Sequence, residues 1–286
     1  MQPARRTDAN QKQAEVWNGA GGRAWVEGQA LLDHMYQPVV DAIFAACPPA
    51  IGDRVLDVGC GTGAVTIAYA RYLDTGPACV GVDFSFPMIE AARARSEREK
   101  INAHFIQADA QVYPFEEASF DLLVSRFGVM FFDDPVRAFS NLRRAAKPNA
   151  KACFAVWRGP ADNAFMRDAE LAAAPFLPDA PAPDPGAPGR FALSDRDKIE
   201  VILSNSGWGG IDVLYADIPS SLPLRHLDYM FTSFGPIGGA FRQLNKESQA
   251  QLVETVRPVF SKNVIGEEVH FTAGCWIILA HASHSL

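Results

Sequence analysis

VLDVGCGTGAVT, residues 55–66, is the stretch that decides the fold we predict for this chain. An apolar run passes through Asp57, glycines alternate at positions 59, 61 and 63, and a helical pattern starts directly behind them. Alternate glycines let the backbone turn sharply and let a ligand approach without meeting a Cβ atom. The helix start behind them offers free N–H groups and the positive end of a helix dipole. We therefore expect a nucleotide-like or carboxylate-bearing ligand at this loop.

Apolar runs alternate with helix-like segments through the first half of the chain. The runs lie at 54–59, 78–83, 103–109, 120–128 and 151–158, with helical segments at 64–73, 87–100 and 134–146. Behind a proline-rich stretch at 175–190 we predict a helix from Ser194 to Ser206 with Ser194 as its N-cap, a strand at 210–218 and a last strand within 266–283. Strands that alternate with helices and are apolar throughout are typical of a parallel sheet covered on both faces. The prediction is one α/β fold with about seven strands.

The composition excludes several classes of protein. The 286 residues carry 26 Lys and Arg against 33 Asp and Glu, a net charge of −7, whereas nucleic-acid binding usually needs a basic face. Five cysteines without a CxxC pair predict neither a disulfide framework nor a zinc site, and no other metal site is expected. We expect a cytoplasmic protein without a signal peptide or membrane span, because the N-terminus is polar and no run of 18 apolar residues occurs.

A second acidic residue extends the ligand prediction. Asp83 ends the second apolar run 20 residues after Gly63, where a carboxylate can bind two ribose hydroxyls. GCGTGA also satisfies the dinucleotide fingerprint, so an NAD(P)-dependent oxidoreductase is one alternative. Asp57 disfavours that alternative, because a buried carboxylate beside the loop repels a pyrophosphate and suits a cationic amino group. Asp109, after the third run, could accept a hydrogen bond from an adenine amino group.

Five motifs in order resemble those of the class I S-adenosylmethionine-dependent methyltransferases. They are VLDVGCGTG, GVDFSFPMIEAAR, QADAQVYPF, FDLLVSRFGVMFFDDP and LRRAAKPNAKACFAVW, and the likeness covers roughly residues 16–158. Within that family the chain is most similar to the quinone and small-molecule methyltransferases, although it lacks their fuller N-terminal signature. KPNAK stands where the family usually has a KPGG turn. Asn can take the place of a glycine there because it tolerates a left-handed backbone conformation. The resemblance implies a Rossmann-like, seven-stranded, mostly parallel sheet with an antiparallel last strand and lid insertions.

The resemblance also implies S-adenosylmethionine as cofactor, with S-adenosylhomocysteine as product, and a set of binding residues. Asp57 would face the methionine amino group, directly or through water, Asp83 the ribose hydroxyls, and Asp109 with Ala110 the adenine amino edge. Ser125, through its backbone, and Arg126 would lie beside the methionine end. Phe84 or Met88 would lie against adenine. Trp17 and Trp25 belong to an N-terminal segment that would close over the cofactor, or they simply pack that segment's helix. The full predicted set is Trp17, Trp25, Asp57, Gly59, Cys60, Gly61, Gly63, Asp83, Phe84, Met88, Asp109, Ala110, Ser125 and Arg126.

The acceptor is less well defined by the sequence. The sulfonium methyl is already activated, so a general base is needed only for a hydroxyl or carbon-acid acceptor. The candidates are His34, Tyr36 and Arg126, with His226 in the second insertion. Large apolar residues could line a pocket for a small, hydrophobic acceptor, or form the core of the lid: Phe131, Phe165, Met230, Phe231 and Phe234.

These expectations divide the chain into six segments. They are an N-terminal helical cap (1–50), the cofactor-binding core (51–158), a Pro-rich insertion (159–193), a core helix and sixth strand (194–218), a lid insertion (219–265) and the last core strand (266–286). The predicted function is methyl transfer by in-line displacement to an O, N or C atom of a small molecule, by a monomer or homodimer. A methyltransferase-like protein that binds the cofactor without catalysis is the third alternative.

Overall fold

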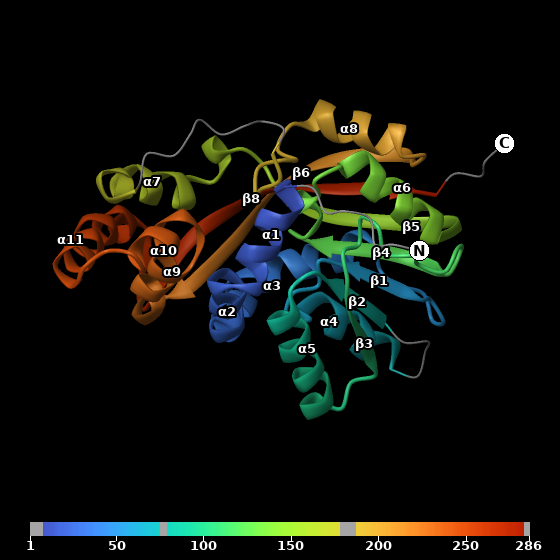
Figure 1. Cartoon of the computed structure of the whole chain (residues 1–286), viewed down its shortest axis with the longest axis horizontal. Helices are drawn as coiled ribbons and strands as arrows, with labels where there is room; N and C mark the ends of the chain where they lie inside the picture. Colours follow the sequence, from blue (N-terminus) through green and yellow to red (C-terminus); the bar gives the residue numbers. More distant parts are fainter. Residues whose placement is uncertain (1–7, 75–78, 178–186, 283–286) are drawn as a thin grey trace.

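The strand order β3-β2-β1-β4-β5-β8-β6 organises the computed structural model, which describes residues 8–74, 79–177 and 187–282 (Figure 1). Strands β1 to β5 pair in parallel, and β8 runs antiparallel between β5 and β6. A two-residue strand, β7, pairs with β8 beside this path. The predicted Rossmann-like sheet with an antiparallel last strand is thereby confirmed. The strands are β1 Val55–Val58, β2 Cys79–Asp83, β3 Ala103–Gln107, β4 Phe120–Arg126, β5 Ala146–Trp157, β6 Gly209–Pro223, β7 Val264–Ile265 and β8 Glu268–His281.

Helices cover both faces of this sheet because its central strands are apolar on both sides. All four residues of β1 are buried, as are the last six of β5. One face carries α3 (Gln29–Ala46), α4 (Ala64–Leu73) and α5 (Phe86–Glu99), and the other carries α6 (Pro135–Ala145) and α8 (Arg196–Asn205). The turn before the buried part of β5 has Asn149 at φ 63°, the left-handed conformation expected there.

Two predicted boundaries are wrong. The N-cap of α8 is Asp195, whose Oδ1 accepts hydrogen bonds from the backbone N–H groups of Asp197 and Lys198 at 2.9 and 3.2 Å. Ser194 instead accepts a hydrogen bond from Trp276 Nε1 at its carbonyl oxygen. Strand β6 continues past the predicted end at residue 218 to Pro223, which pairs with Glu268. Residues 219–223 form a strand although they include polar residues, because alternate side chains, those of Ser220 and Leu222, are buried. Strand β8 pairs with this stretch along its whole length.

The long β6–β8 pair carries a helical lid at its far end (Figure 1). The lid contains α9 (Leu227–Ser233), α10 (Gly235–Phe241) and α11 (Lys246–Val256), and α7 (Ala164–Ala173) packs against α10 and α11. Helices α1 (Asp8–Asn18) and α2 (Ala20–Glu27) lie between this lid and the core sheet. Short 3₁₀ helices lie at residues 129–131, 160–162, 174–176, 224–226 and 257–263. Residues 178–186 of the predicted Pro-rich insertion lie outside the described residues. Within the described ranges, no helix has both the length and the apolarity to cross a bilayer.

Candidate active site

The backbone N–H groups of the glycine loop bind within the protein. Gly59 and Cys60 both donate to the carbonyl oxygen of Val82, at 2.8 and 3.1 Å. Gly61 donates to Asp83 Oδ2 at 2.8 Å, and Gly63 donates to the carbonyl oxygen of Cys60 at 2.9 Å. These four donors are therefore already bonded within the protein, and at the helix start behind them the Thr66 N–H is bonded to Asp57. A pyrophosphate would lose the donors that hold it in dinucleotide sites.

The Asp57 carboxylate lies at the N-terminal end of α4, where the pyrophosphate of a dinucleotide would bind. Its Oδ2 accepts hydrogen bonds from the backbone N–H and the hydroxyl of Thr66, at 2.9 and 2.6 Å, within the first turn of α4. Burial raises the pKa of Asp57 to about 6. Its Oδ1 is buried and has no hydrogen-bond partner among the described residues. The helix dipole thus faces a carboxylate of the protein itself.

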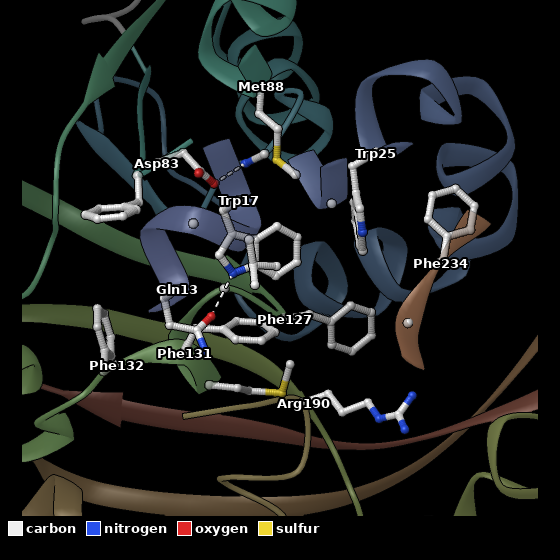
Figure 2. Close-up of a pocket in the computed structure, with 18 of the residues that line it drawn as sticks. Gln13, Trp17, Trp25, Asp83, Met88, Phe127, Phe131, Phe132, Arg190 and Phe234 are labelled. Carbon is white, nitrogen blue, oxygen red and sulfur yellow. Dashed lines mark hydrogen bonds between the residues drawn. The ribbon is translucent and has the colours of Figure 1, made fainter. Parts of the chain in front are cut away.

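A cavity of about 990 Å³ opens at the carboxyl ends of β1, β2 and β4, under α1 and α2 (Figure 2). One end is bounded by Gly59, Gly61 and Asp83. Asp83 is held in place because its Oδ1 accepts from Ser85 N at 2.8 Å while its Oδ2 accepts from Gly61 N. Burial raises the pKa of this carboxyl group. A Cβ on Gly61 would have only Met88 Sδ nearby, at 3.7 Å, so the loop is open toward the cavity.

The other end of the cavity is an aromatic chamber, defined here by Tyr36, Phe127, Phe131, Trp157 and Phe234. Phe127 stacks on Trp157 with ring centroids 4.0 Å apart, and Tyr36 meets both rings edge-on. Burial raises the pKa of Tyr36 to about 12. The chamber and the acidic end belong to one continuous cavity, so two ligands can lie side by side in it.

The N-terminal helices close this cavity with two tryptophans. Trp17 meets Phe131 and Trp25 edge-on, with centroids 5.1 and 6.0 Å apart, and its Nε1 donates to Gln13 Oε1 (Figure 2). A hydrogen bond joins this N-terminal segment to the β2–α5 junction: Ser85 Oγ donates to the Trp17 carbonyl oxygen at 2.6 Å. The same junction holds Asp83.

Comparison with known proteins agrees with this geometry. A model of the methyltransferase domain matches residues 55–149. A demethylmenaquinone methyltransferase of Renibacterium salmoninarum is 31% identical over 196 residues, which cover 66% of this chain and 77% of that protein. A 2-phytyl-1,4-naphtoquinone methyltransferase of Trichormus variabilis is 34% identical over 116 residues, 40% of this chain and 51% of the relative, so the match spans about half of that relative.

The chain belongs to the class I S-adenosylmethionine-dependent methyltransferases.

Solved structures share the fold of this methyltransferase. The phosphoethanolamine N-methyltransferase 2 of Haemonchus contortus, in complex with S-adenosyl-L-methionine, superposes with a TM-score of 0.58 at 19% identity and covers 99% of this chain and 61% of its own. The YcgJ protein of Bacillus subtilis gives a TM-score of 0.57 at 18% identity, covering 86% and 98%. The residues fit the cofactor, since the open loop at Gly61 and the fixed Asp83 carboxylate face the same cavity.

The structure brings most predicted residues of the methyltransferase site together. Those that line the cavity are Trp17, Trp25, Tyr36, Gly59, Gly61, Asp83, Phe84, Met88, Asp109, Ala110, Arg126, Phe131 and Phe234. Arg126 lies beside Tyr36, with its guanidinium carbon 5.9 Å from the ring centroid. Its Nη1 is buried without a hydrogen-bond partner in the described part of the chain.

Four predicted cofactor residues lie behind the cavity wall. Asp57 faces Thr66, and Cys60 is buried under the loop against Gly81. Gly63 begins α4 at φ 85°, with Phe105 against it. Ser125 Oγ donates to the Val58 carbonyl oxygen at 2.6 Å and accepts from Gly128 N at 3.1 Å. Asp57, Cys60 and Ser125 thus direct their side chains into the protein, and Gly63 has none. The predicted roles of Asp57, through water, and of Ser125, through its backbone, stay predictions.

Four predicted catalytic or acceptor residues also lie elsewhere. His34 is half exposed, with its Nε2 3.5 Å from Glu268 Oε2. Phe231 is buried and stacks on Phe260, Phe165 packs against Phe271, and Met230 packs against the core. His226, the other histidine considered, precedes α9 and is also not part of the wall. The mismatch for the three apolar residues arises because Phe231 belongs to the main apolar core of the protein and Phe165 and Met230 pack against it.

Sequence reasoning missed other residues of the wall: Gln13, Gln111, Phe127, Met130, Trp157, Arg190 and Arg242. Trp157 could have been found, because it ends an apolar strand and ligands bind at the carboxyl ends of parallel strands. Arg190 and Arg242 have no such signal, since both lie in irregular segments of the two insertions.

Proposed function

We propose that this methyltransferase transfers a methyl group to a small aromatic acceptor bound in the aromatic chamber. The observation that carries the proposal is the single cavity that joins this chamber to the acidic end at Asp83. Two relatives whose names specify demethylmenaquinone and 2-phytyl-1,4-naphtoquinone as their substrates support a ring-bearing acceptor. Flat aromatic walls suit a ring, because ring pairs gain beyond the area that they bury.

The cavity wall supports a role for each end. Asp83 would accept hydrogen bonds from the ribose hydroxyls, and Asp109 with Ala110 would bind the adenine edge. Phe84 and Met88 would pack against adenine, while Trp17 and Trp25 would exclude water from above. The cofactor supplies an activated methyl group, so the protein's main task is alignment, which contributes on the order of 7–11 kcal/mol.

We propose that proton removal does not depend on a histidine or on Tyr36. In the described residues no histidine lines the cavity. Tyr36, with a pKa of about 12, holds its proton at neutral pH. An acceptor whose own hydroxyl is acidic, such as a phenol or hydroquinone, reacts without a strong base from the protein.

The assignment of segments is likewise a proposal. Helices α1 and α2 would serve as the cap, and α7 with α9 to α11 as the lid. The five cysteines are buried free thiols, which supports a reducing, cytoplasmic compartment. The net charge of −7 supports a small-molecule acceptor over nucleic acid. The proposed oligomeric state is a monomer or homodimer.

Thermal unfolding followed by a methyl-transfer assay tests the proposal. Ligand at 100 times its Kd stabilises by about 2.7 kcal/mol, so S-adenosylhomocysteine should raise the Tm by several degrees, and NAD or NADP should not. Labelled methyl should then reach 1,4-naphthohydroquinone or 1-naphthol. A protein that binds S-adenosylhomocysteine but methylates only aliphatic amines would contradict the aromatic acceptor.

A further inference from the structure

Charge is distributed unevenly along the cavity. Its acidic lining residues are Glu15 on α1, Asp83 at the end of β2, Asp109 after β3 and Asp133 before α6. The two insertions instead contribute Arg190 and Arg242 to the lining and, among the described residues, no acidic side chain; the other basic lining residues are Lys12 on α1 and Arg126. The chain as a whole carries a net charge of −7, so this cationic lining is a local feature.

Arg190 and Arg242 lie on the lid side of the chamber. Figure 2 shows Arg190 on the side of the cavity opposite Asp83. A Cβ built on Gly235 at the start of α10 would lie 3.6 Å from Arg190 Nη1, so Arg190 adjoins the lid. Arg242 follows α10 and donates through Nη1 to the Ser233 carbonyl oxygen at 3.1 Å.

The charges of these two arginines are incompletely matched by the protein. Arg190 Nη2 pairs with Glu170 of α7, which is not part of the cavity wall, and among the described residues its Nη1 has one hydrogen-bond partner, the sulfur of Met166 at 3.9 Å. Arg242 forms no ion pair with any described residue. A guanidinium offers five N–H donors in a planar fork that matches a carboxylate. Both arginines therefore have donors left for an anion inside the cavity.

We infer that the acceptor is an aromatic acid, whose ring lies in the aromatic chamber and whose anionic group binds Arg190 and Arg242. The inference rests on the proposed function and narrows its substrate class. Ligand pockets usually enclose about 300–1,000 Å³, so this cavity of about 990 Å³ has room for an acceptor beside the cofactor. Arg126 lies beside Tyr36, with its guanidinium carbon 5.9 Å from the ring centroid, and is left to the cofactor, the role that the family resemblance gives it.

Two naphthalenes that differ only by a carboxylate test the inference. Calorimetry on the protein saturated with S-adenosylhomocysteine compares 1-hydroxy-2-naphthoate with 1-naphthol. We expect the naphthoate to bind at least tenfold more tightly, since hydrogen bonds between a guanidinium and a carboxylate are stronger than those between neutral groups. Arg242→Gln should weaken naphthoate binding roughly tenfold and leave 1-naphthol unchanged.

Matched variants separate the charge from the fold. Arg225→Gln removes an exposed arginine of the same insertion that does not line the cavity, so it should change nothing. Glu170→Gln breaks the ion pair of Arg190 but keeps the guanidinium, so naphthoate binding should be retained or strengthened. Arg190→Gln should weaken it.

The outcomes distinguish this inference from the proposed function. Failure of the wild-type protein to bind S-adenosylhomocysteine would overturn both. Equal affinity for the two naphthalenes in the loaded protein would overturn the acid group alone. Loss of S-adenosylhomocysteine binding in a stably folded Arg242→Gln protein would assign that arginine to the cofactor and overturn the inference as well.

Discussion

The Asp57 carboxylate of β1 caps helix α4 through Thr66, accepting from the Thr66 backbone N–H at 2.9 Å and from its hydroxyl at 2.6 Å. A side chain from the preceding strand thus satisfies a donor at the start of the helix. The Asp57 carboxylate lies under the glycine loop and faces the positive end of the α4 dipole. The loop therefore presents its backbone, and not the start of α4, to the cavity. Burial of the same carboxylate, which outweighs these hydrogen bonds, makes the stability of the protein depend on pH.

Asp57→Asn should flatten the pH dependence of stability between about pH 4 and pH 6. Burial raises the pKa of Asp57 from 3.8 to about 6, so the folded state keeps a proton that the unfolded chain has released. The contribution of this group is therefore fully present below about pH 4 and is lost as pH rises through 6. It amounts to roughly 3 kcal/mol, because a tenfold change in proton affinity corresponds to about 1.4 kcal/mol. Urea unfolding of both proteins from pH 4 to pH 7 measures it, and parallel curves would contradict the shift.

Asp83→Asn should weaken S-adenosylhomocysteine binding by about 10- to 150-fold, because hydrogen bonds to a charged acceptor are worth about 1.5–3 kcal/mol. We expect this loss because two backbone N–H groups hold the Asp83 carboxylate in the cavity wall, where the cofactor would bind. Asp121→Asn is the matched control, since Asp121 also accepts a backbone hydrogen bond, from Arg54, but lies outside the wall. Calorimetric titration should separate the two variants. Equal affinities would remove Asp83 from the cofactor site.

Gly128→Ala should destabilise the protein by at least about 3 kcal/mol, the upper range for overpacking. A Cβ at Gly128 would lie 2.4 Å from the Val58 carbonyl oxygen and 2.6 Å from Gly59 Cα, and neither backbone can move aside cheaply. The φ of Gly128 is −83°, so the cost comes from contact and not from backbone strain. Gly189→Ala, which has no atom within 4 Å of its Cβ, is the control. Urea midpoints that agree for the two variants would refute the close approach of β1 and β4.

Truncating Phe231 should lower the stability of the protein, whereas truncating Phe234 should weaken acceptor binding. Phe231 is buried against Phe260, so Phe231→Ala should cost about 3–5 kcal/mol of stability. Phe234 lines the cavity beside Trp25, so Phe234→Ala should raise the acceptor KM and leave S-adenosylhomocysteine affinity unchanged. Denaturant unfolding and steady-state kinetics measure the two effects. An unchanged KM in a folded Phe234→Ala enzyme would exclude Phe234 from the acceptor pocket.

Tyr36→Phe should retain most of its methyl-transfer activity. A general base contributes about 10²- to 10⁴-fold, and a tyrosine with a pKa of about 12 does not fill that role at pH 7. The variant keeps the ring that meets Phe127 and Trp157. The pH profile of kcat, measured from pH 6 to pH 9, should have the same shape in both proteins. A hundredfold loss at every pH would restore Tyr36 as a catalytic residue.

The cofactor end of the site was predictable from the sequence because it consists of local pieces. Gly59, Gly61 and Asp83 lie at the ends of consecutive parallel strands, and strands of this kind bring their carboxyl ends to one edge. Asp109 and Ala110 follow the next strand in the same way. Short, continuous apolar runs mark the central strands, and the right-handed crossover between parallel strands limits their order.

The sequence by itself therefore determined the sheet, its glycine loop and the acids at its edge. Only the tertiary structure decided that Asp57 faces Thr66, that Phe231 lies in the apolar core while Phe234 reaches the cavity, and that Arg190 and Arg242 line the same cavity as the aromatic chamber. Residues in insertions have no fixed spacing from the sheet, so their positions depend on how α7 and α9 to α11 pack on the β6–β8 pair. That packing rests on long-range apolar contacts, which no local pattern encodes.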